Sequence, residues 1–293
     1  MFLLVIVNAL FATTFTICKA ALNTGITPVF LIGLRMSIAG FCLLTYWYLF
    51  GLTQKGKIKE NLKGVILYTC FGIAVAFLVG SWVLRNTTSI KLSLVFNLSP
   101  FISALLSYFM LKEKINRKRW IGLSVGLFGF VPLALCSTES SSILKLGIFD
   151  FLMLVPVFAY TYGWVQMRAL VKNGMSPIWV NGVAMLFTGV VCIVVSLVTS
   201  SIGIISSWPH LIFLVVLVVI MVHIISYVSL GFLLKRYTAT FVMLSGLLRP
   251  VFATIYGYIF LGEAIRLHFF ISMACVCAGL YIFYKQEASK ISL

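Results

Sequence analysis

Two arginines, Arg35 and Arg249, lie inside hydrophobic segments, where a charged side chain needs a partner, water or an anionic ligand. Arg249 follows the apolar stretch VMLSGLL and is the stronger candidate for binding, because a guanidinium can hold a carboxylate through paired hydrogen bonds. A structural partner, such as a tyrosine hydroxyl or a helix carbonyl, is the alternative. The residue types therefore indicate a binding site for an anionic group around Arg249.

Neutral polar and aromatic side chains in the hydrophobic segments could complete such a site. Aromatic faces can stack on a planar or cationic group of a ligand. Tyrosines and tryptophans near segment ends can instead anchor a protein at the membrane interface. The further candidates for ligand binding are Asn8, Trp82, Asn97, Ser99, Tyr160, Trp164, His223, Tyr227 and Ser245.

The chain has only six acidic residues, and none lies at the centre of a hydrophobic segment. Proton-coupled exchange of a cation usually requires a carboxylate at that depth, so the sequence disfavours it. His223 could carry a proton near neutral pH, although a single histidine in an apolar segment is more often a packed, hydrogen-bonded residue. Three scattered histidines, and seven cysteines without a CxxC pair, predict no enzyme active site, no metal and no other cofactor.

These residues belong to a chain of 293 residues that is 62% hydrophobic and only 10% charged, which is typical of a membrane protein. A helix needs about 20 apolar residues to span a bilayer. Runs such as LIFLVVLVVIMV do not alternate apolar and polar residues, so they predict helices rather than a β-barrel. Ten such stretches lie at residues 2–20, 28–50, 64–84, 89–111, 119–136, 146–166, 177–199, 210–233, 238–261 and 266–284.

Most of the net charge of +16 comes from the short connections between these stretches, where basic residues set the orientation of a membrane protein. With the N-terminus inside, fifteen basic residues fall on the cytoplasmic side and five on the outer side. This asymmetry predicts that both termini lie in the cytoplasm, and the protein is expected in a bacterial inner membrane. The basic residues therefore serve to orient the protein in the lipid bilayer, and no nucleic-acid partner is expected.

The two halves of the chain repeat one pattern of proline and glutamate. Pro100 is followed thirteen residues later by Glu113, and Pro250 thirteen residues later by Glu263, with 150 residues between the copies. Each proline is expected to kink its helix near the membrane centre, since it removes a backbone hydrogen bond. Each glutamate is expected to cap the following helix or to pair with Lys112, Lys114 or Arg266, rather than to control passage through the protein.

Such duplication predicts an all-α polytopic membrane protein with ten transmembrane helices, arranged as two inverted five-helix repeats. The second copy is inverted because five is an odd number, so this copy enters the bilayer from the opposite side. The first repeat is assigned to residues 1–140 and the second to residues 141–293.

The chain resembles the drug/metabolite transporter superfamily, specifically its ten-span EamA-type family. The resemblance lies in LSP at 98–100, RP at 249–250, FMLKEKINRKRWIGLSVGLFG at 109–129 and IFLGEAIRLHFFISMACVCAG at 259–279. It implies a basket-shaped bundle in which spans 1, 3, 4, 6, 8 and 9 surround a central cavity. Spans 5 and 10 would support packing or a homodimer. Because span 2 lies outside the cavity set, Arg35 is expected to pack or pair laterally.

The resemblance implies a transporter rather than an enzyme, one that moves a small organic metabolite by alternating access. Facilitated uptake or exchange of an amino acid, or of S-adenosylmethionine and S-adenosylhomocysteine, is the leading interpretation by analogy with relatives. A proton-coupled exporter of amino acids or drugs is one alternative, and a lipid-linked sugar flippase or a membrane lipid enzyme is another. Selectivity is expected at Arg249, which stands opposite Ser99 of the first copy.

Overall fold

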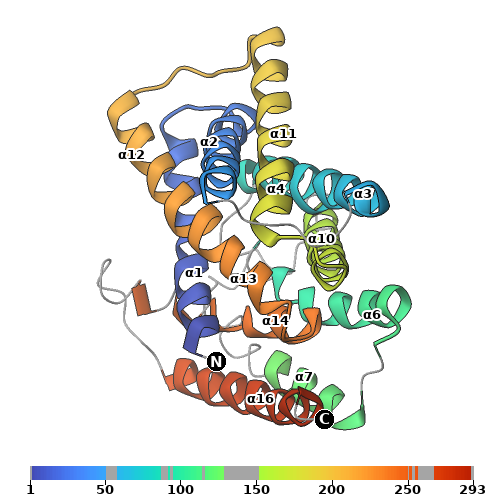
Figure 1. Cartoon of the computed structure of the whole chain (residues 1–293). Coiled ribbons are helices and arrows are strands. Elements are labelled where there is room, and N and C mark those ends of the chain that lie inside the picture. The colour runs from blue at the N-terminus through green and yellow to red at the C-terminus, as the bar shows by residue number, and fades with distance from the viewer. Residues whose placement is uncertain are drawn as a thin grey trace.

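The computed structural model describes residues 2–50, 58–86, 92, 95–113, 116–128, 152–249, 251–252, 255–256 and 267–291. These residues are nearly all helical, apart from turns and an isolated antiparallel bridge between Ile26 and Gly203. Helices from the two halves of the chain pack against one another (Figure 1). Pro250, Glu263 and the junction between the two predicted repeats lie outside the described residues.

Short turns with specific caps separate the apolar helices of the first half. At the start of α2, the Thr27 hydroxyl accepts a hydrogen bond from the backbone N–H of Phe30, and Pro28 occupies the first turn. The helices of this half are α1 (Phe2–Asn23), α2 (Pro28–Leu49), α3 (Ile58–Leu67), η1 (Tyr68–Val75), α4 (Ala76–Asn86), α6 (Ser99–Leu111) and α7 (Arg117–Phe128).

The second half follows the same order where it is described. Ser176 and Pro177 begin α11 as Thr27 and Pro28 begin α2, and a π-helical segment again interrupts the following long helix. The helices are α10 (Leu154–Lys172), α11 (Pro177–Val198), α12 (Trp208–Val218), η2 (Val219–Ser226), α13 (Tyr227–Leu233), α14 (Ala239–Ser245) and α16 (Leu267–Ile291).

Within the described residues, five helices are long and apolar enough to cross a membrane. They expose large apolar side chains such as Phe41, Phe187 and Phe213, as expected of helices that are hydrophobic all round and face lipid. Each of the other five predicted spans includes residues outside the described part, so the count of ten stays a prediction. The five helices are Phe2–Asn23, Pro28–Leu49, Ile58–Asn86, Pro177–Val198 and Trp208–Leu233.

The closest packing between the two halves joins α2 and α11, which lie side by side in Figure 1. A Cβ atom built on Gly40 would lie 2.3 Å from the backbone nitrogen of Leu186, and one built on Gly189 would lie 2.3 Å from that of Ser37. The two contacts are equivalent, because residues 37 and 40 of the first half correspond to residues 186 and 189 of the second, 149 positions later. Because Gly33 meets Ile193 while Gly40 meets Leu186, the two helices run antiparallel.

The sequence analysis expected Pro100 to kink its helix by removing a backbone hydrogen bond, but a turn precedes it instead, and an equivalent turn occurs in the second half. Residues 97–98 form a turn before α6, so Pro100 lies in the first helical turn, where its missing N–H removes no hydrogen bond. A matching turn at residues 246–247 follows α14 and is stabilised by a bond from the Leu247 N–H to the Leu244 carbonyl. Arg249 comes directly after this second break.

The α1–α2 turn is bound to the α11–α12 connection. The Thr27 N–H donates to the Ile202 carbonyl at 3.0 Å, and the Ser206 N–H donates to the Thr24 carbonyl at 2.9 Å. Gly25 and Gly203 both have φ of +94°, and a Cβ atom on either would lie within about 2.1 Å of a carbonyl oxygen of the other segment. We call this contact the Ile26–Gly203 bridge.

The α2–α11 contact predicts that Gly40→Ala lowers the thermal stability of the purified protein in detergent. The new methyl group would meet the backbone of α11, and overpacking of this kind costs about 1–3 kcal/mol. Gly80→Ala is the matched control, because its Cβ atom would make an ordinary 3.5 Å contact with Pro156. Equal melting temperatures for the two variants would contradict the close packing.

Candidate functional site

A cavity lies between the helices of the two halves, and its lining is mostly apolar. The only charged side chains among its described lining residues are Arg35 and Arg249, and no acidic residue occurs there. The lining consists of Phe11, Thr14, Cys18, Arg35, Ala76, Phe77, Gly80, Ser81, Leu84, Leu92, Phe96, Tyr160, Val222, Tyr227 and Arg249.

Arg249 is held in this lining by polar contacts with two helices. Its Nε donates to Oδ1 of Asn8 on α1 at 3.1 Å, and its Nη2 donates to the Tyr160 hydroxyl on α10 at 3.4 Å. The guanidinium carbon lies 4.4 Å from the ring centroid of Phe11, within cation–π distance. These contacts orient the guanidinium and engage two of its five N–H groups.

Asn8 connects Arg249 to a second polar residue. Its side-chain nitrogen donates to the Ser245 hydroxyl at 2.9 Å and to the Leu4 carbonyl at 2.8 Å, and the residue is fully buried. Ser245 in turn donates to the Val242 carbonyl. The cluster of Arg249, Asn8 and Ser245 therefore joins α1 to α14, which are distant in sequence.

Aromatic rings form one wall of the cavity around Tyr227. The ring of Tyr227 lies 5.6 Å from that of Phe11 and 6.2 Å from that of Phe77, and Trp164 packs behind it at 5.0 Å. Tyr160 lies 6.0 Å from Trp164 in an edge-on arrangement. These rings provide flat apolar faces beside the Arg249 guanidinium.

His223 stacks on Tyr227, with ring centroids 5.9 Å apart and the ring planes 8° from parallel. It is fully buried, and its Nδ1 lies 3.2 Å from the Val218 carbonyl. It belongs to the packing layer behind the cavity, since the lining residue next to it is Val222.

Three of the predicted binding residues, Arg249, Tyr160 and Tyr227, line the cavity. Three others lie elsewhere. Trp82 is 47% exposed, Asn97 is buried in the turn before α6, and Ser99 is buried as the first residue of α6. Asn8, Trp164 and His223 contact lining residues from behind, and Ser245 contacts Asn8.

Arg35 also lines the cavity, where the sequence analysis expected a packing residue outside it. Its Nη1 lies 2.8 Å from the sulfur of Cys18, and its guanidinium lies 5.1 Å from the centroid of Phe77. Phe11 and Phe77 are further lining residues that the sequence analysis missed. The span containing each is apolar all round, so no periodicity marks the face that points inward.

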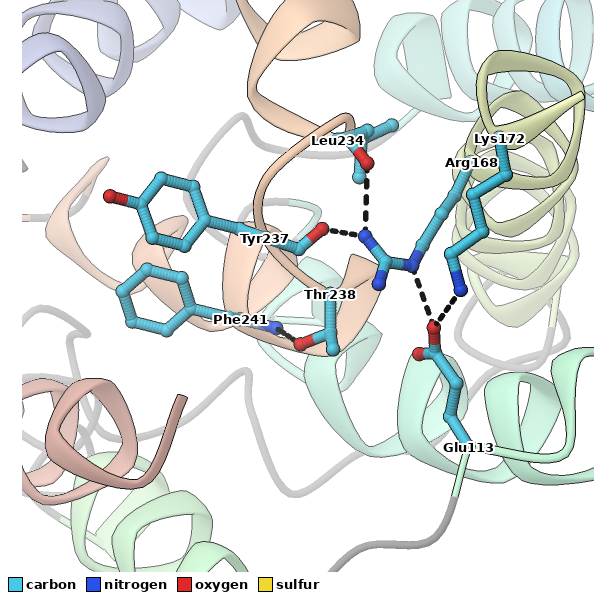
Figure 2. Close-up of polar contacts among 7 residues, drawn as sticks. All are labelled: Glu113, Arg168, Lys172, Leu234, Tyr237, Thr238 and Phe241. Carbon is cyan, nitrogen blue, oxygen red and sulfur yellow. Dashed lines mark hydrogen bonds and ion pairs between the residues drawn. The ribbon is translucent and has the colours of Figure 1, made fainter. Parts of the chain in front are cut away.

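A charged cluster joins the ends of α6, α10 and α13 (Figure 2). Glu113, just after α6, accepts hydrogen bonds at 2.8 Å from Nε of Arg168 and from Nζ of Lys172, both on α10. Arg168 also donates to the backbone carbonyls of Leu234 and Tyr237, which follow α13. We call these five residues the Glu113 cluster. The sequence analysis did not name Arg168 or Lys172 as partners of Glu113.

The Glu113 cluster and the Ile26–Gly203 bridge lie at opposite ends of α11. The chain leaves α10 near Lys172 and enters α11 at Pro177, whereas it leaves α11 at Val198, close to the bridge. A helix of 22 residues is about 33 Å long, so it separates these two contacts by roughly the thickness of a bilayer core.

Comparison with known proteins identifies the family. Residues 1–135 and 147–285 each match the EamA-like transporter family. The chain belongs to the EamA-like transporter family. This EamA-like transporter is therefore a multi-pass membrane protein, as the motifs around both prolines predict.

Individual relatives match the EamA-like transporter over most of its length. A protein of Chlamydia muridarum named S-adenosylmethionine/S-adenosylhomocysteine transporter is 25% identical over 97% of this chain and 91% of its own. The uncharacterized transporter YetK of Bacillus subtilis is 20% identical over 87% of this chain and 78% of its own. One solved structure superposes with a TM-score of 0.75 at 18% identity, covering 98% and 97% of the two chains, which supports the fold.

The geometry of the Glu113 cluster predicts that Arg168→Met destabilises the protein far more than Lys172→Met. The Arg168 side chain is 8% exposed, so its loss leaves buried acceptors unpaired at about 1–3 kcal/mol each. The Lys172 side chain is 47% exposed, and an exposed ion pair contributes about 0–1 kcal/mol. Melting temperatures in detergent measure the difference, and similar values for the two variants would contradict it.

Proposed function

We propose that this EamA-like transporter carries a small organic metabolite with a carboxylate and a planar ring, of the S-adenosylmethionine or S-adenosylhomocysteine type. The observation that carries the proposal is the oriented guanidinium of Arg249 in an apolar, aromatic cavity whose described lining contains no acid. A guanidinium in such a setting favours an anionic partner, and a carboxylate matches its fork of N–H groups.

The aromatic residues that line the cavity are suited to contact the planar ring of the proposed substrate. Phe11, Tyr160 and Tyr227 line the cavity next to Arg249, so a planar base bound there would contact their apolar surfaces while its carboxylate reaches the guanidinium. The name of the Chlamydia muridarum relative supports this substrate class, because S-adenosylmethionine and S-adenosylhomocysteine both join an amino-acid carboxylate to adenine.

Facilitated passage or exchange suits the site better than proton-driven export. A carboxylate that could trade a proton for the substrate is missing from the described lining, and His223 packs behind that lining. The chain functions as a transporter rather than as an enzyme. In support of this, both halves of the chain match the EamA-like transporter family.

The transporter is built from two inverted repeats, residues 1–140 and 141–293, with ten spans and both termini in the cytoplasm. The mirrored contacts between Gly40 and Leu186 and between Gly189 and Ser37 support this architecture. Exchanging the two halves converts one contact into the other, as a two-fold axis in the membrane plane requires. The matching π-helical segments η1 and η2 support it as well.

In this architecture the Glu113 cluster lies on the cytoplasmic side and holds that end of the bundle closed. It ties α6 and α10 to the connection between α13 and α14, elements that the resemblance assigns to the walls of the cavity. Alternating access requires these elements to separate, so the cluster breaks when the site opens to the cytoplasm.

The proposed role of Arg249 predicts that Arg249→Met lowers counterflow of labelled S-adenosylhomocysteine in liposomes by about 10- to 100-fold. A hydrogen bond to a charged group contributes about 1.5–3 kcal/mol, and the variant lacks it. Arg85→Met, which removes an exposed arginine outside the lining, is the matched control. Unaltered counterflow by Arg249→Met would assign Arg249 to structure.

Exchange without a carried proton predicts that His223→Gln keeps the pH profile of transport. Glutamine retains hydrogen-bonding capacity but cannot carry a proton between pH 5 and 8. The measurement is the initial rate of counterflow across that range for both proteins. Loss of a pH-dependent component in the variant would support the alternative, a proton-coupled exporter.

A further inference from the structure

Arg35 is a buried cation without a carboxylate partner among the described residues. It is 2% exposed, and the hydrogen-bond partner of its Nη1 within the described part of the chain is the thiol of Cys18, at 2.8 Å. Sulfur is a weak hydrogen-bond acceptor, so this contact compensates little of the cost of burying a guanidinium. The Nε atom of Arg35 is buried and has no hydrogen-bond partner in the described part of the chain.

Two other polar atoms of the same cavity lining share this property. The hydroxyl groups of Thr14 on α1 and Tyr227 on α13 are buried and make no hydrogen bond with any described residue. Buried polar atoms are as a rule hydrogen-bonded, and unsatisfied ones call for an explanation. Three such atoms from three helices in one lining indicate a polar ligand there.

The charges of the lining restrict which ligand this is. Arg35 and Arg249 are both cationic, and no acid balances them in the lining described above. A carboxylate bound at Arg249 compensates one of the two charges, so Arg35 still opposes any further positive charge on the ligand. In a cavity of low dielectric, such like-charge repulsion is much stronger than in water.

We propose that Arg35 is a second ligand-binding residue and that, together with Arg249, it makes the cavity select ligands without a net positive charge. This inference rests on the proposed function and deepens it. It states that the neutral thioether S-adenosylhomocysteine binds more tightly than its sulfonium counterpart S-adenosylmethionine, which has one additional positive charge.

The two phenylalanine rings nearest the arginines do not remove this preference. A sulfonium could be stabilised over the face of an aromatic ring. However, the guanidinium of Arg249 already lies 4.4 Å from the centroid of Phe11, and that of Arg35 lies 5.1 Å from the centroid of Phe77. The rings nearest the two arginines therefore already make cation–π contacts with the protein itself.

Calorimetric titration of the purified, detergent-solubilised protein with both compounds at low salt tests the inference. We expect the wild-type protein to bind S-adenosylhomocysteine about tenfold more tightly than S-adenosylmethionine, the scale of a moderately screened charge repulsion. Arg35→Met should bring this ratio close to one. Arg35→Lys, which keeps the charge, and Arg85→Met, which removes an exposed charge outside the lining, should both preserve it.

The outcomes separate this inference from the proposed function. Binding of neither compound to the wild-type protein would overturn the proposed function. Binding of both, with S-adenosylmethionine equal or tighter, would overturn only the inference about Arg35. The inference about Arg35 would also be overturned if a monodisperse Arg35→Met variant kept the wild-type ratio of the two affinities. The wild-type ratio and the Arg35→Lys variant still decide the question if Arg35→Met does not fold.

Discussion

A guanidinium inside an apolar bundle is the constraint around which this protein is organised. Arg249 would be costly at this position without partners, and Asn8 and Tyr160 supply them from α1 and α10. Asn8 is in turn fixed by Ser245, so the chain's first helix is bound to α14 through one buried polar group. The contacts that make the charge tolerable also hold the guanidinium in the cavity lining.

The duplication explains the frame that surrounds this site and also its asymmetry. The α2–α11 contact has the same glycine pairing when the halves are exchanged, so the centre of the bundle is closely packed in the same way from either half. Around that centre the two copies differ in chemistry: Arg249 follows one helix break, and Ser99 follows the other. A symmetric frame with an asymmetric polar site is well suited to a transporter, because the frame can rock while a single orientation of the substrate is held.

The two ends of the bundle are closed by contacts of different kinds. The Ile26–Gly203 bridge uses backbone hydrogen bonds and tightly packed glycines, which leave little room for rearrangement. The Glu113 cluster uses side chains, with a carboxylate shared by Arg168 and the half-exposed Lys172. Within the cluster the Lys172 contact is an exposed ion pair of small free energy, whereas the Arg168 contacts are buried and costly to break.

The sequence by itself determined that this is a helical membrane protein of the EamA-like family, and it singled out Arg249, Tyr160 and Tyr227, which line the cavity. The lengths of the hydrophobic segments, the distribution of basic residues and the local motifs are properties of the chain alone, so they can be identified without a structure. Only the tertiary structure decided that Arg35 lines the cavity, that Trp82 is half exposed and that Glu113 pairs with residues of α10. The physical reason is that lipid is as apolar as the protein interior. A spanning helix therefore has no polar face to mark its outward side, and the inward-facing residues emerge only when the helices pack.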